Sequence, residues 1–221
     1  MADLDQVYAH RYSVESQRDR ARIWPEIVRY LERWIDPAKP VLDVACDRGY
    51  FIRNVRAAER WATDVRNLAS EFPRDIRFVQ ADGLELDGVL PAGTFGTIFM
   101  SNYLEHLPDA DAVIRQFRVA RRLLRPGGRL IVLQPNVRLI GGAYWDFIDH
   151  KVPLTERSLV EAGELAGLHD VAVITRFLPY SMNSRLPVHP LLVRAYLHIP
   201  LAWRVFGRQT LYVAGPREPG A

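Results

Sequence analysis

The sequence predicts an α/β protein: a doubly wound, mostly parallel seven-stranded sheet with helices on both faces. Two observations lead to this class. Short runs of β-branched and aliphatic residues alternate with helix-like segments along the 221 residues. Some runs are uninterrupted, such as Leu130-Ile131-Val132-Leu133, which suits central strands buried on both sides. Parallel strands joined by right-handed crossovers then place helices on both faces of the sheet.

The elements follow one another in a regular order. A first helix is expected over 14–35, where apolar residues recur three to four apart, with Pro25 inside it. Thr155 is a candidate N-cap for a later helix. Strands are expected at 41–45, 60–63, 76–80, 96–101, 129–134, 170–177 and 209–214. Helices are expected at 49–57, 66–72, 109–124, 155–166, 190–198 and 201–206. Pro126-Gly127-Gly128 should stop the helix before it and turn the chain.

The domain organisation has three parts. Residues 1–39 are expected to form an N-terminal helical cap, and residues 40–214 the main domain. Within that domain, residues 178–208 should be a helical insertion or lid before the last strand. Residues 215–221 follow the domain as a disordered tail. The long loop 135–153 is rich in glycine and aromatic residues, and loops of this length are often functional.

Composition excludes several classes of protein. No run approaches the ~18 uncharged apolar residues of a membrane span, and the acidic residues 1–5 do not resemble a signal peptide. Cys46 is the only cysteine, which excludes an intrachain disulfide or a cysteine metal cluster and favours the cytoplasm. The net charge is +3, but the arginines are scattered without interleaved aromatic residues, so nucleic-acid binding is disfavoured.

The stretch 41–51 reads as a buried strand, a tight turn and a helix start that Asp47 could cap. A dinucleotide turn needs small residues at i, i+2 and i+5, and counting from Ala45 the last of these is Tyr50. Small residues at i, i+2 and i+4 fit better, because the third is then Gly49. The Asp47 carboxylate would also repel a pyrophosphate, whereas a cationic sulfonium ligand with an amino-acid tail meets no such penalty.

Residues 41–49 resemble the first motif of the class I S-adenosylmethionine-dependent methyltransferases, in the broad small-molecule, type 11-like group. That motif is usually an acid followed by Gly-x-Gly-x-Gly. The segments 101–107 (Ser-Asn-Tyr-Leu-Glu-His-Leu) and 123–130 (Leu-Leu-Arg-Pro-Gly-Gly-Arg-Leu) resemble later family motifs. The resemblance covers about residues 40–177, and the motifs fall in the family's order.

The resemblance implies S-adenosylmethionine as cofactor and S-adenosylhomocysteine as product. Asp64, which ends the second strand, would accept hydrogen bonds from the ribose hydroxyls, and Asp82 would lie near the adenine amino group. Structural alternatives are an N-cap role for Asp64 and an Asx-turn for Asp82. The implied cofactor residues are Asp43, Ala45, Cys46, Asp47, Gly49, Asp64, Val65, Asp82, Gly83, Ser101 and Asn102.

Two substitutions distinguish this turn from the family pattern, because Ala45 and Asp47 stand where the first two glycines usually lie. Alanine should cost little if its φ is negative, and aspartate tolerates left-handed φ better than most residues. Asp47 could pair with the ammonium group of the ligand or weaken its binding. Cys46 is expected to be a small buried residue, because no base accompanies it.

Histidines supply the candidate catalytic groups. His150, with Asp149 or Asp146 orienting its ring, could take a proton from an acceptor hydroxyl, and His106 could do the same. Each could equally be a structural histidine. Aromatic residues could form the acceptor wall or anchor the long loop instead; the candidates are Tyr144, Trp145, Phe147 and Tyr103. No metal site is expected.

The segment 188–206 mixes apolar residues with arginines. It could lie on a membrane surface, touch a lipid-linked acceptor or form a dimer face. A helical lid packed on the sheet is the interpretation we favour.

The expected function is methyl transfer from S-adenosylmethionine to a small-molecule acceptor, with a hydroxyl as the methylated group, for example on a sugar or glycolipid. One alternative, motivated by Asp47, is a cofactor-binding protein without catalytic activity, and another is an RNA methyltransferase. A nicotinamide dehydrogenase is disfavoured by Tyr50 and Asp47. The chain is expected to act as a monomer or homodimer, with peripheral membrane contact open.

Overall fold

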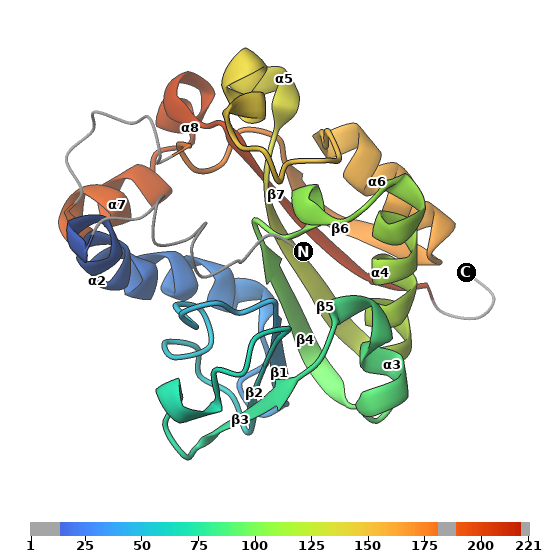
Figure 1. Cartoon of the computed structure of the whole chain (residues 1–221). Coiled ribbons are helices and arrows are strands. Elements are labelled where there is room, and N and C mark those ends of the chain that lie inside the picture. Colours follow the sequence, from blue (N-terminus) through green and yellow to red (C-terminus); the bar gives the residue numbers. More distant parts are fainter. Residues whose placement is uncertain (1–13, 181–188, 218–221) are drawn as a thin grey trace.

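A computed structural model describes residues 14–180 and 189–217. Its seven strands form one sheet in the order β3-β2-β1-β4-β5-β7-β6, in which only β7 runs antiparallel to its neighbours (Figure 1). This confirms the predicted fold class. The strands are β1 (Val41–Val44), β2 (Arg60–Asp64), β3 (Ile76–Gln80), β4 (Phe95–Ser101), β5 (Leu124–Pro135), β6 (Leu168–Ile174) and β7 (Gln209–Pro216).

Helices cover both faces of the sheet. Figure 1 shows α3, α4 and α6 on one side and α2 and α7 on the other. Among the described residues, no helix has the length and hydrophobicity needed to span a membrane. The helices are α2 (Val14–Leu31), α3 (Leu86–Val89), α4 (Ala110–Leu123), α5 (Val137–Ile140), α6 (Glu156–Leu165), α7 (Pro190–Leu197) and α8 (Pro200–Phe206). The short 3-10 helices include η1 (Glu32–Trp34), η2 (Ala69–Glu71), η3 (Gly83–Glu85), η4 (Leu104–His106) and η5 (Gly141–Asp146).

The core is divided into two layers because successive side chains of a strand point to opposite faces. In β5, Leu130 and Val132 pack with α4 and α6, whereas Ile131 and Leu133 pack with α2. All four side chains are buried. The continuous apolar run therefore belongs to a central strand, as predicted.

Helices α4 and α6 begin at side-chain caps. The Asp109 carboxylate accepts a hydrogen bond from the Ala112 N–H at 2.8 Å. Thr155 and Ser158 form a reciprocal capping box, with N···O distances of 3.2 and 2.7 Å. Such caps each contribute about 1 kcal/mol, and the Thr155 cap was predicted.

The predicted helices at 49–57 and 66–72 are wrong. The first is only a series of turns, and the second is reduced to η2. Asn54 explains the first failure: its side-chain amide donates to the Tyr50 carbonyl at 2.8 Å, the acceptor that its own N–H would use in a helix. The Asn54 N–H bonds the Phe51 carbonyl instead. In the second segment, Asn67 similarly accepts from the Ala69 N–H.

Strand β5 is longer than predicted, because the turn at Pro126-Gly127-Gly128 lies within it as an irregularity. The register with β4 jumps from Phe95↔Leu124 to Thr97↔Arg129. Strand β7 is also longer and ends at Pro216. The predicted tail therefore includes two residues of the sheet, and residues 218–221 lie outside the described part.

The turn after β1 bends through three left-handed residues, because φ is +53° at Ala45, +47° at Asp47 and +67° at Gly49. The condition of a negative φ, under which alanine would cost little at position 45, is not met, and this conformation costs alanine about 1–2 kcal/mol. Only glycine fits at position 49, where a Cβ would collide with the Phe72 ring. The backbone thus follows the three-glycine path although only one glycine is present.

The strain at Ala45 predicts the effect of replacing it. Ala45→Gly relieves the left-handed conformation but increases the freedom of the unfolded chain, for a net stabilisation of about 0.5–1 kcal/mol. Denaturant unfolding measures this change. The control is Ala195→Gly in the exposed interior of α7, which should destabilise the protein by up to about 1 kcal/mol. Equal destabilisation by both substitutions would contradict strain at Ala45.

Candidate active site

A cavity opens where β1, β4 and β5 end, the edge at which open α/β sheets bind ligands. Six predicted cofactor residues line it: Asp43, Ala45, Cys46, Asp47, Ser101 and Asn102. The predicted catalytic residues His106 and His150 lie in the same wall, together with Glu105. The structure therefore brings the turn after β1 and the histidines of two distant loops to one cavity.

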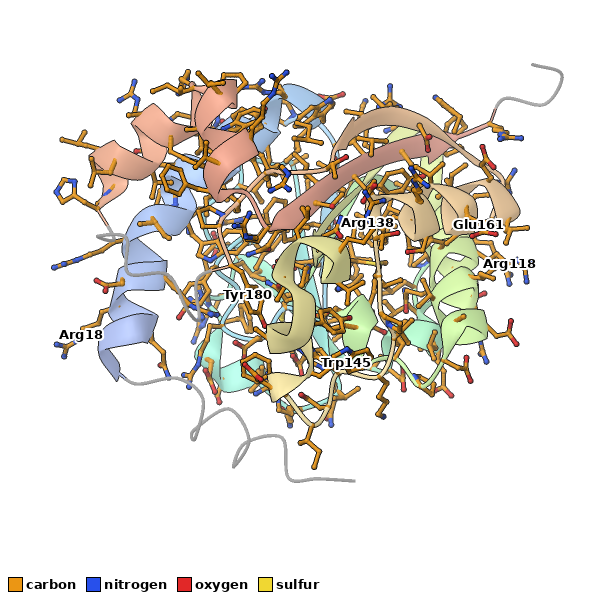
Figure 2. All side chains as sticks on the ribbon, turned by 90° about the horizontal axis from the view of Figure 1, so that it is seen from above. Arg18, Arg118, Arg138, Trp145, Glu161 and Tyr180 are labelled. Carbon is orange, nitrogen blue, oxygen red and sulfur yellow. The ribbon has the colours of Figure 1, made fainter. Side chains whose placement is uncertain are left out.

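Other parts of the cavity wall were not predicted. Arg20 and Trp24 come from α2, and Trp24 stacks on Tyr50 with ring centroids 6.3 Å apart. Tyr180 and Gln209 also line the cavity. In the view from above (Figure 2), Tyr180 lies between α2 and the α5–η5 segment. No local pattern distinguishes these residues from ordinary core positions, because tertiary packing alone places them here.

Asp43 lies at the base of the cavity and is only 4% exposed. One carboxylate oxygen accepts the Ile52 N–H at 3.3 Å. Burial raises the pKa of Asp43 well above its ordinary range, and the nearby carboxylates of Asp64 and Asp47 raise it further. Its surroundings thus disfavour the charged form of this carboxyl group.

Asp64, Arg66 and Asp47 form a charged clamp beside the turn. The Arg66 guanidinium contacts both oxygens of Asp64, at 3.0 and 3.1 Å, and one oxygen of Asp47 at 2.8 Å. Asp64 also accepts the backbone N–H of Asp47 at 3.1 Å. Burial opposes the charge on Arg66, but the two acids outweigh it and raise its pKa. Arg66 was not identified as a site residue from the sequence, although a basic residue two positions after Asp64 is visible there.

Of the five predicted cofactor residues outside the cavity wall, Gly49 lies in the turn after β1 and Asp64 ends β2, and the other three follow β2 and β3. Val65 is 48% exposed beside the clamp. Asp82 caps η3 by accepting the Leu84 N–H at 2.9 Å, as the Asx-turn alternative predicted. Gly83 lies beneath the Tyr103 hydroxyl, where a side chain would collide. That hydroxyl donates to Gln116 at 3.0 Å, so Tyr103 does not face the cavity.

Cys46 is buried and free. Burial raises the pKa of its thiol, and the carboxylates of Asp43, Asp64 and Asp47 raise it further. The thiol therefore stays protonated, which agrees with a packing role rather than a nucleophilic one.

The two histidines lie face to edge, with ring centroids 5.1 Å apart. His150 is buried, and its Nδ1 lies 2.7 Å from the Tyr144 carbonyl, so Nδ1 carries the proton and donates. Nδ1 of His106 lies 3.1 Å from the Asp149 carbonyl and 3.2 Å from its carboxylate. Asp149 therefore orients His106. From the sequence, Asp149 or Asp146 was expected to orient His150 instead.

The pKa values of the two rings are shifted in opposite directions. Burial lowers the pKa of His150, and the neighbouring His106 lowers it further, although Glu105 and Asp149 oppose this. Burial also disfavours the charged form of His106, but the hydrogen bond to Asp149 and the charge of Glu105 outweigh it and raise its pKa. At neutral pH, His150 is consequently the neutral partner, with its Nε2 lone pair available.

Glu105 completes this cluster, and we missed it from the sequence although it directly precedes His106. It is 1% exposed and accepts from the Gln134 amide at 2.8 Å. One ligand atom from each of Glu105, His106 and His150 lies within 4.8 Å of the others, so they could hold a divalent ion. Two bonds of about 2.1 Å to one ion span at most about 4.2 Å, so the side chains would have to close in.

The loop before His150 is anchored by aromatic residues. Tyr144 is fully buried, and its hydroxyl donates to the Val152 carbonyl. Trp145 is 53% exposed and packs on Tyr144 at 5.1 Å. Neither lines the cavity; Phe147 does, and its ring lies 5.1 Å from that of His150. For Tyr144 and Trp145, the structure agrees with the alternative that they anchor the loop.

Comparisons with known proteins agree with this geometry. The profile of a methyltransferase domain family matches residues 16–173. No curated protein matches the sequence. Among solved structures, the fold is similar to an S-adenosylmethionine-dependent methyltransferase from Archaeoglobus fulgidus, with a TM-score of 0.63, 18% identity and coverage of 86% of this chain and 91% of that one.

Two further structures share the fold. The methyltransferase complex with the Haloferax volcanii Trm112 activator has a TM-score of 0.67 and 16% identity, covering 92% of this chain and 96% of that one. Geranyl diphosphate C-methyltransferase from Streptomyces coelicolor has a TM-score of 0.60 and 15% identity, covering 87% and 76%. Because the family profile spans well over half of the sequence, the chain belongs to this methyltransferase domain family, with the class I fold of S-adenosylmethionine-dependent enzymes.

Proposed function

We propose that the protein transfers a methyl group from S-adenosylmethionine to a hydroxyl of a small-molecule acceptor, such as a sugar or glycolipid. The observation that carries this proposal is the neutral, buried His150 in the same cavity as the turn after β1. Methylation of a hydroxyl requires a base, whereas a carboxylate or neutral amine acceptor would not. We also propose a cytoplasmic location, to which the single free thiol is suited.

The residues of the chain fit this cofactor. Left-handed φ values at positions 45, 47 and 49 keep the turn tight, so its backbone can approach a ligand. Asp64 ends β2, where it can accept from ribose hydroxyls, and exposed Val65 can pack on adenine. The charge of Asp47, which raised doubt about activity, is compensated by Arg66. Ribose binding would require Arg66 to share or release the Asp64 oxygens.

The chemistry assigned to the chain is positioning and proton transfer. The bound cofactor would supply an electrophilic methyl group, so that the acceptor oxygen gains a C–O bond as the S–CH₃ bond breaks. His150 receives the hydroxyl proton at Nε2, while the Tyr144 carbonyl holds its Nδ1–H. His106, oriented by Asp149, keeps His150 neutral before the reaction. Buried Glu105 favours the imidazolium that forms.

Two alternatives are distinguished by one assay. Methyl-labelled S-adenosylmethionine is incubated with the protein and with separate water-soluble, lipid and RNA fractions of a cell extract. Label in a small molecule or lipid supports the proposal. Label in RNA would support an RNA methyltransferase, and cofactor binding without any labelled product would support an inactive binding protein.

Asp64 should dominate cofactor affinity. Asp64→Asn keeps the shape but weakens charge-assisted hydrogen bonds to ribose, each worth about 1.5–3 kcal/mol, so the Kd for S-adenosylmethionine should rise about 10–100-fold in titration calorimetry. The control is Asp75→Asn, because Asp75 is an exposed partner of Arg60 before β3. Unchanged affinity in a folded Asp64→Asn protein would remove Asp64 from the site.

His150 should control turnover but not cofactor binding. His150→Gln should lower kcat about 10²–10⁴-fold with an unchanged Kd for the cofactor, whereas His169→Gln on exposed β6 should change neither. Because the pKa of His150 is lowered, the acidic loss of activity should occur below the ordinary value of about 6.5. A limb above that value would argue against His150.

The same assay tests a metal. If the histidines act as proposed, treatment with a chelator leaves the rate unchanged. Loss of activity on chelation, with recovery on adding a divalent ion, would instead assign Glu105, His106 and His150 as ligands.

A further inference from the structure

The hairpin formed by α7 and α8, residues 190–206, is firmly attached to the domain by its inner side. The Tyr196 hydroxyl donates to the Phe177 carbonyl at 2.5 Å, and the Trp203 indole N–H donates to the Tyr196 carbonyl at 2.8 Å. The Trp203 ring also packs against Tyr30 of α2 at 5.8 Å. The inner apolar positions are thus occupied, and the hairpin packs on α2 and Phe177, while its interpretation as a lid stays a prediction.

The outer side of the hairpin is apolar as well, which that interpretation does not explain. A surface helix normally turns polar residues outward, and single exposed apolar residues need no explanation. Here six apolar side chains, all within residues 191–206, are each between 43% and 69% exposed. These are Leu191, Leu192, Ile199, Leu201, Val205 and Phe206.

Charge is segregated onto the same part of the chain. Between Asp170 and Glu218 there is no acidic residue and no lysine, but there are six arginines. Since the whole chain carries only +3, the remaining residues are together net negative. Arg194 and Arg204 are exposed on the hairpin itself. Arginine is about as frequent here as in the rest of the chain, so the positive charge of this segment comes from its lack of acidic residues.

The exposed apolar side chains and the positive charge of the hairpin together favour an anionic lipid bilayer as its partner. Helices that combine exposed aliphatic and aromatic residues with arginines suit the interface of an anionic bilayer, where each nearby basic residue contributes about 1 kcal/mol. A second copy of the chain fits less well, because a symmetric contact would bring Arg194 and Arg204 of both copies together. A lipid surface instead supplies both apolar depth and negative charge.

The hairpin is also joined to the cavity. In the sequence, the hairpin lies between Tyr180 and Gln209, and both of these residues line the cavity. The loop that carries Phe147 and His150 exposes Trp145 and Ile148, the latter 93% exposed. Figure 1 shows α8 and the α5 segment at the same end of the molecule. Apolar residues from two segments therefore flank the region of the cavity.

We propose that the α7–α8 hairpin docks on an anionic membrane surface and presents the cavity to a lipid-linked acceptor. The docking step stands on the hairpin alone, whereas the acceptor class rests on the proposed function. Docking would bury the outer residues of the hairpin at the boundary of the headgroups, with Arg194 and Arg204 against lipid phosphates or carboxylates.

Vesicle flotation of the full-length protein tests docking without cofactor or acceptor. The protein should bind vesicles of phosphatidylcholine with 30% phosphatidylglycerol at least ten-fold more tightly than phosphatidylcholine alone, and 0.5 M salt should weaken binding. Leu191→Asp with Leu201→Asp should reduce binding at least ten-fold, as should Arg194→Glu with Arg204→Glu. Leu165→Asp on α6, 54% exposed in the wild type, is the matched control and should bind as wild type.

The outcomes separate docking from catalysis. Unchanged melting temperatures and cofactor affinity establish that the variants are folded. Absence of wild-type binding, or binding by the Leu191/Leu201 variant as tight as wild type, overturns docking. A wild-type dimer that this variant converts to a monomer, without vesicle binding, assigns the surface to self-association. If vesicles bind but labelled methyl appears only in water-soluble products, the lipid-linked acceptor is wrong. If no fraction is labelled, the proposed function fails and docking stands.

Discussion

The candidate site depends on one electrostatic constraint: buried acids at the ends of β1 and β2 must be compensated without closing the cavity. At Asp43, burial and the nearby acids raise the pKa and so disfavour the charged form. Asp64 meets the constraint through Arg66 and the N–H of Asp47, and Arg66 also takes up the Asp47 charge. The turn, the end of the neighbouring strand and the charge balance therefore form one unit, and removing Arg66 would leave buried Asp64 without its cationic partner.

Sequence patterns correctly predicted those structural features that depend on interactions between residues close in the chain. The Thr155 cap and the buried run of β5 could be identified because each depends on residues close in sequence. The helices expected at 49–57 and 66–72 failed for the same kind of reason. The Asn54 and Asn67 side chains bond backbone groups of nearby residues and so compete with helical hydrogen bonds, which apolar spacing does not reveal.

The sequence predicted at which strand ends the candidate site lies, but it did not predict which side chains contact one another there. Asp43, Asp47 and His150 were found because each belongs to a motif or an unusual loop. Trp24 and Tyr180 reach the cavity only through the packing of distant segments. The pairing of Asp149 with His106 follows from the path of the loop, in which its neighbour His150 turns toward Tyr144 instead.

The clamp also constrains how this sequence can change. With glycine at position 47, Arg66 would retain only Asp64 as an acidic partner. With a neutral residue at position 66, Asp47 and Asp64 would repel each other across the turn. The effect of the residue at position 47 therefore depends on the residue at position 66, and the reverse also holds. The acid that replaces a glycine in the turn is thus coupled to Arg66. Among relatives of this chain, an acid at position 47 and a base at position 66 should be inherited together.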